Sequence, residues 1–339
     1  MWHRPEAADD FPPFYRGAAL ASAHGNVYET EQGGRYLPFI RIPFYAAALR
    51  PLATLPYTIA RRIWITVLIL AAFGCVGLFP TEKRSFAIAL AFSFPLADAL
   101  MVGQDITLVI LIVLGAARIF AGGREFLAGV AVSLLCIKMT YLPAAGLVFL
   151  AKSRRSFWGL LTGSALQFAL SFAVGGAGWP SQYLAVLRNP LLEPHPSRML
   201  SIREIAVSLS LPSAVYALGA IALYAIFWFA CKRLSLADGL TLALALGLIA
   251  APHCRIYDGV VLIPLFVKVA SLRSWEGLLA CAGLTPAFYI MVLMGNPHVL
   301  LAGDALLIFA TLAAALRLYR NQTTPNHKHA TVPAAMATP

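Results

Sequence analysis

Residues 63–79, IWITVLILAAFGCVGLF, form an apolar stretch without a charged side chain. At 1.5 Å per residue, a helix of this length covers about 26 Å, close to the thickness of the hydrocarbon core of a membrane. Arg61 and Arg62 precede the stretch, and Lys83 and Arg84 follow it. Charged residues at both ends of an apolar run are typical of a transmembrane helix, so the stretch predicts one.

The same pattern recurs along the whole chain, in which 60% of the residues are hydrophobic and 12% are charged. Hydropathy and charged flanks predict helical segments at 60–79, 85–101, 104–121, 125–137, 141–151, 156–175, 209–231, 236–251, 258–272, 276–294 and 299–318. Two of these segments are too short to cross a membrane alone. The sequence therefore predicts an all-α, polytopic transmembrane helical bundle with about 9–11 membrane segments, including short half-helices.

The composition divides the chain into three parts. We expect residues 1–59 to be an extracytoplasmic N-terminal segment with interfacial helices, because prolines and arginines interrupt its apolar stretch at 37–57. Residues 60–318 are predicted to be the transmembrane bundle, with an outer loop at 176–207. Residues 319–339 are rich in Thr, Pro, Ala and His and predict a disordered cytoplasmic tail.

The net charge of +11 and the five cysteines exclude several classes of function. The basic residues are scattered through short loops, where they orient the protein and meet anionic lipid headgroups, which argues against nucleic acid as a partner. The cysteines show no CxxC or Cys/His spacing, so neither a disulfide framework nor a metal site is predicted.

The segment 125–151 has two possible conformations. It can form one long helix with Lys138 at its centre, where a lone ammonium costs about 2.5–3.5 kcal/mol, or a hairpin of two short helices with Lys138 near its tip. The hairpin places 14 Lys and Arg residues on one side of the membrane and five on the other beyond residue 62. We therefore predict the hairpin, with the 14-charge side in the cytoplasm and the turn at His253 outside.

Asp10 is the first polar residue that indicates chemistry on the outer side. Phe11, Phe14 and Tyr15 follow it in the sequence. Partial shielding by these rings raises the pKa of a carboxylate and suits it to act as a general base. The alternative is a solvated loop acid that caps a helix at 15–24.

Gln104, Asp105 and Lys138 are further candidates. Gln104 and Asp105 follow Gly103 at the start of an apolar helix, where free amides favour an anion or a sugar hydroxyl. Helix capping by Asp105 is the alternative. Lys138 needs an anionic partner or water at membrane depth, unless its side chain snorkels to the interface.

Residues 251–258, APHCRIYD, place His253, Arg255, Tyr257 and Asp258 between two apolar segments. With the lysine of the hairpin, the imidazole and the guanidinium can hold a phosphate. The alternative is a structural ion pair at a helix start. The chain has no phosphate-cradling Gly-Lys-Ser/Thr loop and no Asp-x-Asp pair, so basic side chains, and no metal, are expected to hold an anionic donor.

Short motifs in a fixed order carry a resemblance to a known family. They are Asp10-Phe11, Gly103-Gln104, Ala128-Gly129 leading to Lys138, and Pro252-His253 before Tyr257-Asp258. In order and spacing the chain resembles the membrane glycosyltransferases of family 87, of the GT-C class, from about residue 9 to residue 318.

The resemblance implies a hexosyltransferase that moves a sugar, often mannose, from a polyprenyl-phosphate carrier to a lipid or glycan acceptor. It implies a GT-C bundle in a membrane, here the bacterial inner membrane, with the active face extracytoplasmic and with no cofactor besides the lipid-linked donor. Asp10 is the implied general base of an inverting transfer. The expected substrate-binding residues are Tyr15, Gln104, Asp105, Lys138, His253, Arg255, Tyr257 and Asp258.

The chain departs from the family pattern in three places. Asp105 and Met139 stand where the family usually has Asn and Pro, and the span that normally precedes the Asp-Phe motif is absent. We expect either that this span is encoded upstream of Met1 or that the short N-terminal segment is translocated with the first helix. Two other functions remain open. One is a lipid or solute transporter with an intramembrane Lys/His/Asp site, and the other is an inactive scaffold subunit.

Overall fold

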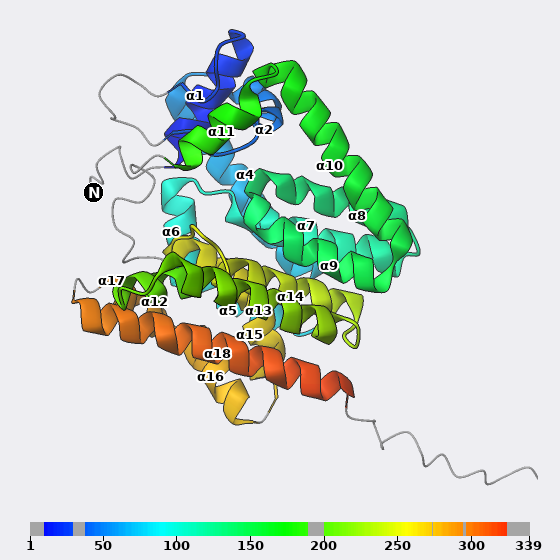
Figure 1. Cartoon of the computed structure of the whole chain (residues 1–339), viewed down its shortest axis with the longest axis vertical. Helices are drawn as coiled ribbons and strands as arrows, with labels where there is room; N and C mark the ends of the chain where they lie inside the picture. Colours follow the sequence, from blue (N-terminus) through cyan, green and yellow to red (C-terminus); the bar gives the residue numbers. More distant parts are fainter. Residues whose placement is uncertain (1–9, 30–37, 189–199, 273, 294–295, 324–339) are drawn as a thin grey trace, which may run out of the picture.

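The computed structural model describes residues 10–29, 38–188, 200–272, 274–293 and 296–323. All regular elements in these ranges are helices (Figure 1), which confirms the predicted all-α class. The elements are α1 (Phe11–Ser22), α2 (Pro43–Ala48), α3 (Arg50–Ala53), α4 (Tyr57–Leu78), α5 (Lys83–Ala91), α6 (Phe94–Val102), α7 (Ile106–Ala121), α8 (Glu125–Ser133), η2 (Leu134–Tyr141), α9 (Leu142–Lys152), α10 (Arg154–Gly175), α11 (Trp179–Leu187), α12 (Ile202–Ser208), α13 (Ser213–Cys231), α14 (Leu236–Ile249), η4 (Ile256–Leu262), α15 (Ile263–Ala270), α16 (Trp275–Gly283), α17 (Pro286–Leu293) and α18 (Pro297–Thr323).

Several of these helices are long and apolar enough to cross a membrane. By length and composition the described residues contain five such segments, or up to seven when the bent pairs α5–α6 (59°) and α16–α17 (54°) each count as one span. Each of the eleven segments predicted from hydropathy coincides with a helix or with a pair of consecutive helices. The chain is an integral membrane protein with a polytopic helical bundle.

The segment Glu125–Lys152 is a hairpin, although its length alone would allow one span. The Ser153 hydroxyl donates to Glu125 Oε2 (2.6 Å), and the Ser156 hydroxyl donates to the Glu125 carbonyl (2.9 Å). A straight helix of this length would separate its two ends by about 42 Å. Lys138 has non-helical dihedral angles (φ −142°, ψ 79°) between the two arms. The predicted hairpin is confirmed.

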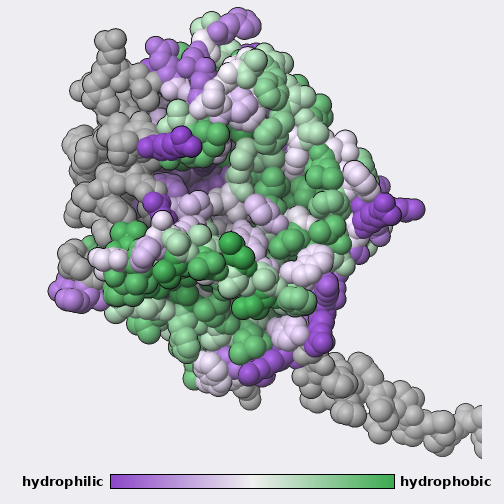
Figure 2. Space-filling view, viewed as in Figure 1, coloured by the Kyte–Doolittle hydropathy of each residue, from purple (hydrophilic) through white to green (hydrophobic). Residues whose placement is uncertain are grey.

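Side-chain contacts define two ends of the bundle. We call the end at the start of α7 the Gln104 end, and there the Tyr216 hydroxyl of α13 donates to the Ala250 carbonyl at the end of α14 (2.9 Å). We call the end where α7 terminates the Arg118 end, and there Lys152 Nζ donates to the Lys232 carbonyl (2.8 Å). Figure 2 shows a broad apolar surface, in green, with hydrophilic side chains gathered at its edges.

The N-terminal helices cover the Gln104 end. Helices α1, α2 and α3 pack against one another, and α2 also packs against α10. The segment expected to be an outer loop, 176–207, contains helix α11 and most of α12, so it is more regular than predicted. Helix α18 continues to Thr323, beyond the predicted boundary at 318, and residues 324–339 of the predicted tail lie outside the described residues.

Helices α8 and α10 pack closely because glycines face the partner backbone. A Cβ atom at Gly129 would overlap the carbonyl oxygen of Ser156, and a Cβ atom at Gly159 would overlap the carbonyl oxygen of Phe126. Small residues that let two backbones approach are typical of helix pairs in membranes. This contact holds one arm of the hairpin in place.

We expect Gly129→Ala to destabilise the protein, because overpacking against a backbone costs about 1–3 kcal/mol and outweighs the better helix propensity of alanine. The measurement is thermal unfolding in detergent. Gly77→Ala is the matched control, since a Cβ atom at Gly77 meets nothing within 4 Å. An equal melting temperature for both variants would show that α8 and α10 do not depend on this close contact.

Candidate active site

The turn between α6 and α7 brings Asp10 to the bundle. Gly103 ends α6 with a left-handed φ of +74°, and a Cβ atom there would lie 2.8 Å from Cβ of Phe11. The Gly103 carbonyl also accepts a hydrogen bond from Trp64 Nε1 (2.7 Å). Only glycine combines this backbone conformation with so close an approach. The start of α1, and with it Asp10, therefore lies directly on the turn.

A chain of hydrogen bonds fixes the Asp10 carboxylate. Its backbone N–H donates to the Val102 carbonyl (2.9 Å), and Gln104 Nε2 donates to Asp10 Oδ2 (3.2 Å). Gln104 Oε1 accepts from Arg41 Nη2 (2.9 Å) and from the backbone N–H of Asp105 (3.1 Å). Because two donors require the amide oxygen on that side, the amide nitrogen must face Asp10.

Arg41 and Asp105 form a buried two-pronged ion pair. Arg41 Nε lies 3.2 Å from Asp105 Oδ2, and Nη2 lies 2.9 Å from Oδ1. Their side chains are 5% and 0% exposed. Burial lowers the pKa of Arg41, but the charge of Asp105 outweighs it and raises the pKa overall. Asp105 was predicted to contact the substrate. In the structure its carboxylate holds Arg41, and it does not line the cleft described below.

Sequence reasoning missed the role of Arg41. It counted this residue only as an interruption of an apolar segment. The available signal was a lone arginine between Ile40 and Ile42, in a segment with a proline on each side. Such a residue needs an anionic partner when it is buried, and here the partner is 64 residues away.

The environment of Asp10 suits proton transfer. Its side chain is buried, and burial raises its pKa to about 6, against the charge of Arg255, a hydrogen bond from Tyr257 and the charges of Arg41 and Lys138. Asp10 stands at the N-cap of α1 but makes no capping hydrogen bond with its side chain. The alternative of a solvated capping acid is therefore wrong.

The second wall of the site comes from η4 and the hairpin tip. Lys138 Nζ forms an ion pair with Asp258 Oδ1, and Asp258 Oδ2 accepts from the backbone N–H of Arg255 (2.9 Å). The Lys138 ammonium also lies 5.4 Å from the centre of the Tyr257 ring. The predicted alternative of an Arg255–Asp258 side-chain pair does not form. In the part of the chain that the structure describes, the Arg255 guanidinium makes no ion pair.

These walls enclose a polar cleft at the Gln104 end. Its polar lining comes from Asp10, Arg41, Gln104, His253, Arg255 and Tyr257, and apolar residues of α1 and of the segment before α2 complete it. Figure 2 shows hydrophilic residues in a hollow between the part with α1 and α11 and the apolar surface below. The free volume is about 20 Å³, which is room for about one water molecule. Binding of a sugar ring requires the lining side chains to move apart.

The structure brings together most of the predicted site residues. Lys138 and Asp258 lie behind the cleft wall as a pair. Tyr15 does not line the cleft, because its hydroxyl donates to the Leu55 carbonyl (2.7 Å) and its ring packs edge-on against Tyr57. Tyr15 therefore connects α1 to the segment before α4.

The cleft combines groups for two kinds of chemistry. A buried carboxylate with a pKa near neutrality can remove a proton from a hydroxyl group. The guanidinium of Arg255, beside an imidazole, can bind a phosphate by charge-assisted hydrogen bonds. Among the described residues, no three His, Cys, Asp or Glu side chains lie close enough to hold a metal ion.

The fold and the cleft define a polytopic membrane protein with a polar cleft at one end of a helical bundle. The chain belongs to glycosyltransferase family 87, whose family model matches residues 39–256. The match includes Arg41, Gln104, Lys138 and Arg255, and Asp10 precedes it. No curated protein and no solved structure matches the chain.

We expect Arg41→Met to destabilise the protein by about 3–5 kcal/mol, because it leaves the buried Asp105 carboxylate without a partner. The double variant Arg41→Met/Asp105→Leu should recover much of this loss. Thermal unfolding of the two single variants and of the double variant measures the coupling. If the double variant loses the sum of both single losses, the pair does not act as a unit.

Proposed function

We propose that this glycosyltransferase transfers a hexose, with mannose favoured, from a polyprenyl-phosphate carrier to a hydroxyl of a lipid or glycan acceptor. The observation that carries the proposal is the convergence of Asp10, Gln104, Arg255 and Tyr257 on one cleft at one end of the bundle. During such a transfer the acceptor hydroxyl loses a proton and the departing phosphate gains negative charge. The Asp10 carboxylate can accept the proton, and the Arg255 guanidinium can stabilise the phosphate.

Asp10 is the proposed general base. It takes the proton of the acceptor hydroxyl while the hydroxyl oxygen attacks the anomeric carbon from the side opposite the phosphate. The bond between the anomeric carbon and the phosphate oxygen breaks, and its electron pair leaves with the polyprenyl phosphate. The reaction inverts the anomeric configuration and needs no metal in this proposal. With a pKa of about 6, Asp10 is mostly ionised at neutral pH.

Arg255 and His253 are the proposed partners of the departing phosphate. Both line the cleft, and the Arg255 guanidinium makes no ion pair among the described residues. Lys138 was predicted to share this task, but its ammonium already pairs with Asp258. Its proposed role is to fix η4 and so to position Arg255. Gln104 and Tyr257 orient the sugar or the carrier headgroup.

The distribution of charge supports an extracytoplasmic active face. Of the 14 basic residues counted for one side, Arg273 and Lys328 lie outside the described residues, and the other 12 belong to the Arg118 end. The positive-inside rule therefore assigns that end to the cytoplasm and the cleft to the outside. A transporter, the alternative predicted from the sequence, would present its polar site to both ends in turn. All the site residues lie at the Gln104 end, which favours a transferase over a transporter. The proposed location of the protein is a bacterial inner membrane.

We expect Asp10→Asn to lower sugar transfer by about 100-fold or more, because the amide keeps the shape of the side chain but cannot accept the proton. The assay uses the purified protein with labelled polyprenyl-phosphate mannose or glucose and an extract of membrane lipids as acceptors. Glu29→Gln, an exposed carboxylate of the same N-terminal segment, is the control and should keep full activity. Unchanged transfer by Asp10→Asn would rule out the proposed base.

We also expect kcat/KM to rise with pH, with the midpoint of the rise near pH 6 and a plateau at higher pH, because Asp10 must be ionised to act as a base. Arg255→Met removes a positive charge that lowers the pKa of Asp10. The acidic limb of its pH profile should therefore move to higher pH, whatever the residual rate. A limb at the same pH in both proteins would mean that another group controls it.

A further inference from the structure

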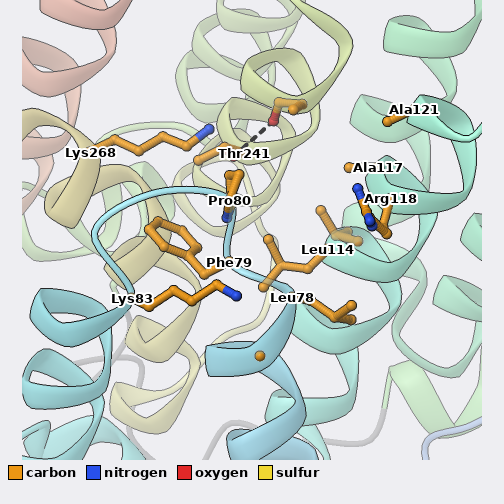
Figure 3. Close-up of a pocket in the computed structure, with 13 residues that line it drawn as sticks. Leu78, Phe79, Pro80, Lys83, Leu114, Ala117, Arg118, Ala121, Thr241 and Lys268 are labelled. Atoms are coloured by element: carbon orange, nitrogen blue, oxygen red, sulfur yellow. Dashed lines mark hydrogen bonds between the residues drawn. The ribbon is translucent and has the colours of Figure 1, made fainter.

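A second pocket lies at the Arg118 end of the bundle, away from the cleft. Its cavity volume is about 390 Å³, within the range typical of small-molecule sites. The ends of α4 and α7, the start of α5, and helices α14 and α15 form its walls (Figure 3). Helix α7 runs from the cleft to this pocket, and Arg118 follows Gln104 by 14 residues, which corresponds to about 21 Å along a helix.

Three cations from three helices line this pocket. They are Lys83 at the start of α5, Arg118 in the last turn of α7, and Lys268 near the end of α15. In Figure 3 the amino groups of Lys83 and Lys268 point into the space between the helices, and Arg118 lies on the opposite wall. Such a convergence of like charges is unfavourable without an anion between them.

Among the described residues, one of these three charges, that of Lys268, has an ionic partner. Lys268 Nζ pairs with Asp238 Oδ1 (2.7 Å), and Asp238 Oδ2 is occupied by Ser235 (2.6 Å) and Gln322 (3.0 Å). Within the described ranges, neither Lys83 nor Arg118 forms an ion pair with Asp238 or with any other carboxylate. As far as the described residues go, the pocket therefore carries two positive charges without an ionic partner beside the Lys268–Asp238 pair.

The floor of the pocket is apolar. It includes Leu78, Phe79 and Leu114, and a Cβ atom at Gly77 would meet nothing within 4 Å. Phe79 is fully buried, and its ring stacks on Phe86 with the ring centres 4.1 Å apart. A ligand that satisfies both the cations and this floor must have a negatively charged group joined to an apolar part.

We propose that the pocket binds the phosphate headgroup of an anionic membrane lipid. The phosphate lies between Lys83 and Arg118, with Lys268 on the third side, and the glycerol and upper acyl chain lie against Leu78 and Leu114. Basic pockets between membrane helices at the positively charged side are suited to such headgroups. The site is separate from the cleft, and the proposal holds whether or not the protein uses a polyprenyl-phosphate donor.

The test measures lipid binding to the purified protein by native mass spectrometry, with phosphatidylglycerol titrated into neutral detergent micelles and no sugar donor present. Lys83→Gln/Arg118→Gln should weaken binding by at least about tenfold. Arg154→Gln/Arg155→Gln is the matched control, because it removes the same charge from two exposed residues at the same end of the bundle. It should bind like the unmodified protein.

A further variant guards against misfolding of the double substitution. Gly77→Phe fills the apolar floor and leaves all three cations in place, and it should also weaken lipid binding. Equal losses in both double variants would overturn the pocket, since they would mean general surface attraction. If inorganic phosphate at millimolar concentration displaces the lipid and protects the protein against heat as well as the lipid does, the site takes a free anion and the lipid assignment fails.

Discussion

The buried ion pair between Arg41 and Asp105 joins the N-terminal helices to the membrane bundle. Removing both charges from water is costly, and only their close two-pronged contact offsets that cost, so the two segments have a single favourable arrangement. The same guanidinium orients the Gln104 amide, which in turn holds Asp10. Arg41 therefore acts on the Asp10 carboxylate through two successive hydrogen bonds, by way of Gln104. The main effect of the Arg41–Asp105 ion pair is to position these side chains, more than to stabilise the fold.

A second buried pair, Lys138 with Asp258, does the same for the opposite wall of the cleft. It ties the hairpin tip to η4 and leaves Asp258 to anchor the backbone of Arg255. Once both pairs are formed, Asp10 and Arg255 are the charged groups of the cleft that make no ion pair with any described residue, although the charge of Arg255 acts on Asp10. Their charges are opposite, and one suits a proton while the other suits a phosphate.

Much of this architecture could be predicted from the sequence, because a membrane imposes simple rules on apolar length and on the placement of basic residues. Those rules predicted the helices of the bundle and the hairpin around Lys138, but not α11 and α12 in the expected outer loop. They could not predict the roles of Arg41 and Asp105, since hydropathy says nothing of a pairing between distant residues. Tyr15 was misplaced for the same reason, because its position depends on the carbonyl of Leu55.

The length of α7 connects the fold to the proposed substrate. A helix of 16 residues is about 24 Å long, shorter than the roughly 30 Å of a hydrocarbon core. If Arg118 lies at one headgroup region, Gln104 at the other end of α7 lies at or slightly below the opposite boundary. A phosphate carried by a lipid sits at that depth, so a lipid-linked sugar can reach Asp10 without leaving the membrane. The short helix thus places the polar cleft at a depth that suits the proposed lipid-linked donor.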